Sequence, residues 1–142
     1  MCIRDREISE ELDIIERVEK EHPLSRLGSV VTPADIISLQ YASISVYVDH
    51  VIKQYIVNIV ELTRHREQIS LGASPRASIG LFHTCKALAL IKGRDYVIPD
   101  DVKDLATPVL AHRLVLSPAA RIAGVNAPQI VSDLLEFVPV PV

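Results

Sequence analysis

The chain has 142 residues, of which 49% are hydrophobic and only 4% aromatic, and its formal net charge at pH 7 is −3. This charge provides no basic surface, so the composition disfavours a nucleic-acid-binding protein. The length suits one domain with a substantial core, and no apolar run approaches the roughly 20 residues of a membrane span. Cys2 and Cys85 have neither metal-site nor redox spacing, and we expect a cytoplasmic protein.

The first 22 residues divide into two pieces. Residues 1–6, MCIRDR, fit no helical pattern, and we expect them to be a non-native leader. From Glu7 to Glu21 the sequence predicts one amphipathic helix that ends at His22-Pro23. Its apolar positions recur at spacings of four, three and three: Ile8, Leu12, Ile15 and Val18.

Two further helices are predicted between residues 32 and 66. Thr32-Pro33 begins the first, with Asp35 placed to answer Thr32 as in a capping box. Its expected apolar side consists of Ile36, Ile37, Leu39 and Ile44. The alternation over residues 44–49 allows one very short strand, after which Asp49 caps the next helix. That helix carries a stripe of Val51, Ile52, Tyr55, Ile56, Ile59, Val60 and Thr63.

The longest pattern, over residues 72–116, contains a central helix. Pro75 suits its first position and Ser74 its cap, while Gly93 suits a left-handed terminator after Ile91. Apolar positions lie on adjoining faces, so we expect little of this helix to face water. They are Ala77, Ile79, Leu81, Phe82, Cys85, Leu88 and Ala89.

Proline punctuates the remaining helices. One helix begins at Pro99, although Ile98 before it has no oxygen to cap the first amides. We expect a break or kink at Thr107-Pro108, with Pro108 restarting the helix as far as Arg113. Shorter helices are predicted from Ser117-Pro118 and from Pro128. The fold class is therefore all-α, with about five to seven helices and at most one very short β element.

Arg76 stands in the first turn of the central helix, where the helix dipole disfavours a cation by about 0.3 to 1 kcal/mol. An anion should compensate. One possibility is a pair with an acidic side chain of the same chain, which is the commoner fate of a surface arginine. The other is an anion site at the helix N-terminus, formed by Gly72, Ser74, Pro75 and Arg76 and suited to phosphate.

Three motifs resemble the lid domain of the MoxR family of AAA+ ATPases. They are GASPRAS at residues 72–78, GRDYV-x-P-D-D-V at residues 93–102, and His112-Arg113-Leu114. The resemblance extends from Glu7 to Val140. It implies that residues 23–142 form the helical lid and that residues 7–22 are the last helix of a missing nucleotide-binding core. It also implies that Arg76 is the second-sensor residue, which contacts the terminal phosphate of ATP.

The same resemblance implies what the full-length parent does. It would bind ATP and Mg2+, assemble into a hexameric ring through its own core and neighbouring subunits, and mature or remodel protein complexes in the manner of a chaperone. A partner with a von Willebrand factor A (VWA) domain is also implied, whereas nucleic acid and membrane are not. Hydrolysis by this chain alone is not expected, because the sequence contains no G-x-x-x-x-G-K-[ST] and no apolar strand ending in paired acids.

Two other classes of function are compatible with a small helical chain. The first is a stand-alone helical interaction module without ATPase activity. The second is DNA binding through the helix after Pro99, which Asp100-Asp101 disfavours because both would repel phosphate. None of the five histidines has zinc-ligand spacing.

Three residues near the motifs have simple structural interpretations. His83, two turns from Arg76, either lines the same cleft or, more simply, packs or faces solvent. Arg113 most simply complements a helix C-terminus. Asp100 and Asp101 are most simply first-turn residues of their helix.

Overall fold

The structure is a computed structural model that describes residues 7–20, 24 and 27–141, without the side chains of residues 17, 19 and 20. The expected leader and the predicted helix end at His22-Pro23 lie outside the described residues. The chain divides into two compact units, Met1–Ile37 and Ser38–Val142. None of the described helices combines the length and the apolar character needed to cross a membrane.

The first unit contains α1 (Ile8–Lys20), which confirms the predicted amphipathic helix. Helix α2 (Pro33–Ser45) spans the boundary between the units. Its capping box is confirmed: the Thr32 amide donates to Asp35 Oδ2 at 2.8 Å, and the Asp35 amide donates to Thr32 Oγ1 at 3.2 Å. The apolar residues of both helices are exposed, including Leu12 and Ile15 on α1 and Ile37 and Leu39 on α2.

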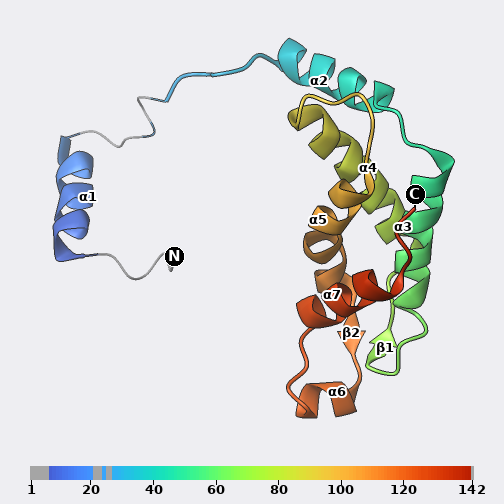
Figure 1. Cartoon of the computed structure of the whole chain (residues 1–142). Coiled ribbons are helices and arrows are strands. Elements are labelled where there is room, and N and C mark those ends of the chain that lie inside the picture. The colour runs from blue at the N-terminus through green and yellow to red at the C-terminus, as the bar shows by residue number, and fades with distance from the viewer. Residues whose placement is uncertain (1–6, 21–23, 25–26, 142) are drawn as a thin grey trace. The chain divides into compact units, whose positions relative to one another are not determined.

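The second unit is built around four helices, shown in Figure 1. Helix α4 (Pro75–Ile91) packs between α3 (His50–Leu62) and α5 (Pro99–Leu110), and α7 (Ala127–Phe137) packs on α5 and α3. A 3₁₀ turn (Ala111–Arg113) and the short helix α6 (Pro118–Ile122) lie between α5 and α7 in sequence. Their shared core includes Ile56, Ile59, Leu81, Val102, Leu110 and Val131.

The described residues contain seven α-helices and one two-stranded sheet, so the all-α fold is confirmed. The sheet pairs β1 (Ile69–Leu71) antiparallel with β2 (Val115–Leu116). The very short strand that the alternation over residues 44–49 allowed does not form: α2 continues to Ser45, and in this stretch only Tyr47 forms an isolated bridge, to Tyr96. The alternation there reflects burial, since Val46 and Val48 point into the core and Tyr47 does not.

Two other expectations about helices need correction. The break allowed at Pro108 does not occur: helix α5 continues through Pro108 to Leu110 and then tightens into the 3₁₀ turn, which ends at Arg113 as expected. Packing compensates for the missing amide, because Ala106 and Leu110 on either side of Pro108 are fully buried. Helix α4 has the predicted bounds but is not buried all round: Leu81 and Cys85 are in the core, whereas Ile79 is 57% exposed.

Candidate functional site

The turn that leads into α4 lies against the end of α3. Gly72 follows β1, and a side chain there would collide with backbone, because its Cβ would lie 2.7 Å from Thr63 O and 2.8 Å from Arg64 Cα. Glycine is therefore required here by close approach rather than by a left-handed conformation. Ala73, the next residue, is 1% exposed.

Two consecutive residues of α3's end hold both backbone polar groups of Ala73. The Ala73 amide donates to Thr63 Oγ1 at 2.9 Å, and Arg64 Nε donates to the Ala73 carbonyl at 2.9 Å. Glu61 accepts from Arg64 NH1 at 2.7 Å, which keeps the guanidinium turned toward the turn. The start of α4 is thus tied directly to the last turn of α3.

The first turn of α4 presents unused hydrogen-bond donors. Ser74 occupies the N-cap position, but its side chain makes no cap hydrogen bond, so the predicted hydroxyl cap is wrong. The hydrogen bond at this end of the helix is made by the backbone instead: the Ala77 amide donates to Ser74 O at 2.8 Å. Pro75 has no amide hydrogen. In the described part of the chain, the Arg76 amide has no acceptor.

The Arg76 side chain is exposed and forms no ion pair or hydrogen bond with any described residue. This disfavours the interpretation in which Arg76 pairs with an acid of its own chain. Most other arginines from residue 38 to residue 141 have a partner: Arg64 and Arg94 bind carboxylates, and Arg66 lies over the Phe137 ring. Within that range only Arg121 resembles Arg76 in being exposed without a side-chain partner.

His83 lies on the same helix and is also exposed. Its ring meets the Phe82 ring edge-on, with the centroids 5.3 Å apart. This exposure agrees with the simpler, solvent-facing interpretation of His83. No group of three or more His, Cys, Asp or Glu side chains suited to a metal ion occurs among the described residues.

Comparisons with known proteins identify the family. The profile of the AAA lid domain family matches residues 61–134, which include the end of α3, the GASPRAS turn and most of α7. The chain belongs to this family, in its MoxR branch. The predicted MoxR-type lid is thereby confirmed.

Individual relatives of this lid domain are longer proteins. The uncharacterized protein YeaC of Bacillus subtilis is 45% identical over 94% of this chain and 42% of its own length. Chaperone MoxR1 of Mycobacterium tuberculosis is 35% identical over 93% of this chain and 37% of its own length. The lid domain thus spans less than half the length of these curated relatives.

A solved structure also resembles the lid domain. The crystal structure of a presumed ATPase from Cytophaga hutchinsonii superposes with a TM-score of 0.83 at 28% identity, over 99% of this chain and 45% of that one. The helical arrangement described above is therefore found within a protein assigned to the ATPases.

The GRDYV-x-P-D-D-V motif of the lid domain contains one buried carboxylate with basic partners. Asp101 is fully buried, and its carboxylate accepts from Arg94 NH2 at 2.6 Å, from the Ile98 amide at 3.1 Å and from Lys92 Nζ at 3.3 Å. Burial raises the pKa of Asp101, but the hydrogen bonds from Arg94, Ile98 and Lys92 outweigh it and hold that pKa below its usual value. Through its bond to the Ile98 amide, the Asp101 carboxylate caps the N-terminus of α5, because the Ile98 side chain has no oxygen of its own.

Asp100 fits the interpretation as a first-turn residue of α5, whereas Asp101 also pairs with the basic residues that follow α4. The Asp100 side chain is 72% exposed and reaches only Lys103 at 3.4 Å. Sequence reasoning treated the two aspartates alike, and it missed that Asp101 joins α4's end to α5's start. The basic residues of Lys92-Gly93-Arg94, seven to nine positions earlier, were the available signal.

The His112-Arg113 motif satisfies carbonyls at the end of α5. Arg113 Nε donates to Val109 O at 3.0 Å, and His112 Nδ1 lies 3.1 Å from Pro108 O. These are carbonyls that a helix end leaves without amide partners, so both side chains act as C-terminal caps. The simple interpretation of Arg113 as a helix C-terminal cation agrees with this geometry.

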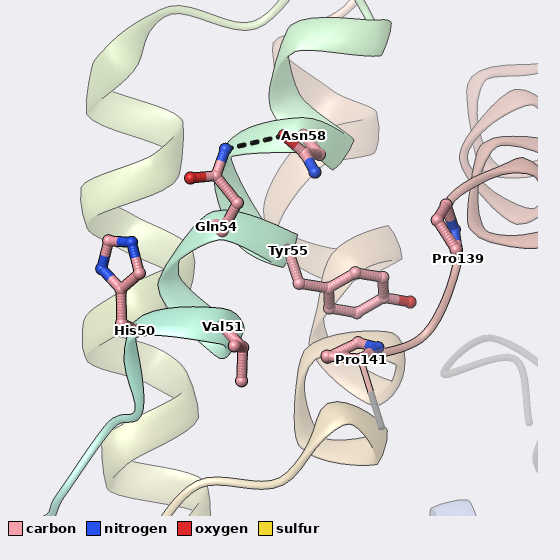
Figure 2. Close-up of a pocket in the computed structure, with 7 residues that line it drawn as sticks. All are labelled: His50, Val51, Gln54, Tyr55, Asn58, Pro139 and Pro141. Atoms are coloured by element: carbon pink, nitrogen blue, oxygen red, sulfur yellow. Dashed lines mark hydrogen bonds between the residues drawn. The ribbon is translucent and has the colours of Figure 1, made fainter.

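A small pocket of the lid domain lies away from Arg76. Its volume is about 250 Å³, and Figure 2 shows its lining by α3 and by the tail after α7. The Tyr55 ring faces the Pro139–Pro141 tail, and its buried hydroxyl has no hydrogen-bond partner among the residues that the structure describes. None of the sequence-predicted site residues lines this pocket, which is bounded by His50, Val51, Gln54, Tyr55, Asn58, Pro139 and Pro141.

Proposed function

We propose that this lid domain belongs to a ring-forming AAA+ ATPase in which Arg76 contacts the terminal phosphate of ATP. The observation that carries the proposal is the first turn of α4. There an exposed arginine, a free Ser74 hydroxyl and a free Arg76 amide stand together without any partner from the described chain. A helix N-terminus with an arginine is chemically suited to phosphate.

The remaining ATPase machinery would come from the rest of the longer protein. This chain contains no phosphate-binding G-x-x-x-x-G-K-[ST] loop, so ATP and Mg2+ would bind chiefly on the nucleotide-binding core. Arg76 would contact the terminal phosphate of ATP from the lid domain. A charge-assisted hydrogen bond of this kind contributes about 1.5 to 3 kcal/mol, enough to bias the lid between two orientations.

Arg76 loses its phosphate partner when ATP is hydrolysed, and the lid is then released to turn on the core. Coupled around a ring of subunits, such turns could drive a chaperone-like remodelling of client proteins. Support for this part comes from the family and from the relative in Mycobacterium tuberculosis, which is named a chaperone. The VWA partner, the six-fold ring and the cytoplasmic location stay predictions.

The alternative is a stand-alone interaction module that docks a partner through its apolar helices. The exposed apolar residues of α1 and α2 agree with either proposal, because the missing core would also cover apolar helix faces. Membership of the AAA lid family and the greater length of the relatives favour the ATPase. Sequencing the DNA upstream of the Glu7 codon distinguishes the two, since only the ATPase requires a P-loop in the same frame.

The test of the Arg76 role is a substitution in the full-length protein. Arg76→Ala should reduce kcat for ATP hydrolysis at least tenfold and weaken ATP-dependent assembly, measured by a coupled assay and by light scattering. Arg121→Ala removes an equally exposed arginine and is the matched control. If Arg76→Ala matches the control in both assays, the proposed role is wrong.

A further inference from the structure

We propose that Thr63 and Arg64 are positioning residues that set where Arg76 presents its guanidinium, a role that rests on the proposed function. They neither touch phosphate nor take part in chemistry. They act by holding Ala73, three residues before Arg76. The hydrogen bonds from the two residues to Ala73 point to this role.

The Thr63 hydroxyl uses both its donor and an acceptor site to join the end of α3 to the turn before α4. Thr63 is 0% exposed, and its Oγ1 donates to Val60 O at 2.6 Å while accepting from the Ala73 amide at 2.9 Å. One hydroxyl therefore joins the last turn of α3 to the turn before α4. Valine has the same shape but neither capacity, so it would leave a buried amide without a partner.

Arg64 completes the attachment at the carbonyl of the same residue, Ala73. Its Nε donates to Ala73 O at 2.9 Å, and its NH1 donates to Glu61 Oε2 at 2.7 Å. The second oxygen of Glu61 lies 3.0 Å from His65 Nε2. Because Glu61 already neutralises Arg64, this arginine serves to hold the turn rather than to supply a second charge to an anion.

Few other polar contacts reach the turn from outside α4. Apart from bonds within α4, the described residues from 72 to 76 make one further hydrogen bond, from the Ala77 amide to Ser74 O, and the Ala73 side chain packs in the core. Gly72 contributes by lacking a side chain, which lets the turn approach Thr63 O. Between Ala73 and Arg76 stand only Ser74 and Pro75, and the proline ring fixes one torsion of that short path.

It follows that the two bonds to Ala73 fix the start of α4 against α3, while the packing of α4 on α3 and α5 holds the body of the helix. Misplacing a charged donor by about 1 Å is enough to lose much of its differential effect on a ligand. Loss of either bond should therefore reduce the preference for ATP over ADP, since only ATP carries the terminal phosphate. A general loss of folding would instead weaken the binding of ATP and of ADP by the same factor.

The experiment measures the dissociation constants of fluorescent ATP and ADP analogues on the full-length protein with Mg2+. Thr63→Val should reduce the preference for ATP about tenfold, the effect of one buried hydrogen bond. Thr63→Ser keeps the hydroxyl and should stay within about twofold of the native preference. Thr84→Val is the matched control, because the Thr84 hydroxyl bonds only to Gly80 O and Leu81 O of its own helix.

A second variant keeps the proposal testable if Thr63→Val does not fold. Arg64→Lys retains the charge but lacks the Nε–H group, and it should reduce the ATP preference about threefold. Equal weakening of ATP and ADP by these variants, or no change in preference, would overturn the positioning role. The proposed function itself fails in a different way, through an unchanged ATP preference in Arg76→Ala.

Discussion

The buried carboxylate of Asp101 allows a sharp test of how the lid is held together. Asp101→Asn keeps the shape of the side chain and removes its charge, while Arg94 and Lys92 remain. Breaking a buried ion pair by removing one partner costs about 3 to 5 kcal/mol. We expect the lower end, about 3 kcal/mol, because the Lys92 side chain is 42% exposed and water can solvate it once the partner is gone.

Asp100→Asn is the matched control, since the same chemical change falls one residue earlier. Asp100 is exposed and its contact with Lys103 is a surface pair, so its loss should cost less than about 1 kcal/mol. Urea unfolding followed by circular dichroism measures both variants. With a slope of about 1 to 3 kcal/mol per M, the midpoint of Asp101→Asn should fall by about 1 to 3 M. Equal midpoints for the two variants would refute the reasoning.

Three further predictions concern pH, close packing and the pocket. Because the folded-state pKa of Asp101 lies below its unfolded value near 3.8, its stabilisation is present above about pH 4 and is lost as pH falls through the folded-state pKa; urea titrations should show a weaker acid dependence for Asp101→Asn than for the native chain. Gly72→Ala should lower the free energy of unfolding by about 1 to 3 kcal/mol, because the new Cβ meets backbone atoms of Thr63 and Arg64, and an unchanged melting temperature would contradict this. Tyr55→Phe removes a buried hydroxyl that has no partner, so thermal unfolding should show equal or greater stability, and a loss above about 1 kcal/mol would mean that the hydroxyl is bonded in solution.

Most helix positions could be predicted because their signals are local. Pro33, Pro75, Pro99 and Pro118 each begin a helix, and Gly93 and Gly124 end helices with positive φ. Such residues restrict the backbone wherever they occur, so no knowledge of distant contacts is needed.

The errors occur where a distant contact decides the outcome. Pro108 is tolerated because α5 is packed on both sides of it, and Ser74 leaves its helix uncapped although its residue type is suited to capping. The pairing of β1 with β2 joins residues 69 and 116, too far apart for any local pattern to indicate. The burial of Asp101 likewise depends on Lys92 and Arg94, which reach it from the preceding loop.

The candidate site was predictable only in part. The resemblance of GASPRAS indicated Arg76, and the structure adds that no described side chain pairs with it. The anchoring pair, Thr63 and Arg64, was missed because both fit a helix end so well that nothing about them required another explanation. Their hydrogen bonds to Ala73 become visible only when the turn lies against α3.

The small sheet has a consequence for the order of folding. Strand β1 precedes α4 and β2 follows α5, so their pairing closes a loop of more than 40 residues, reinforced by the Ser117 amide, which donates to Gln68 O at 2.9 Å. Closing so long a loop costs chain entropy, and the pairing of two short strands alone gains too little free energy to offset that cost. The α4–α5 hairpin should therefore form first, and the Ser117 amide should become protected from hydrogen exchange only when the two helices are already packed.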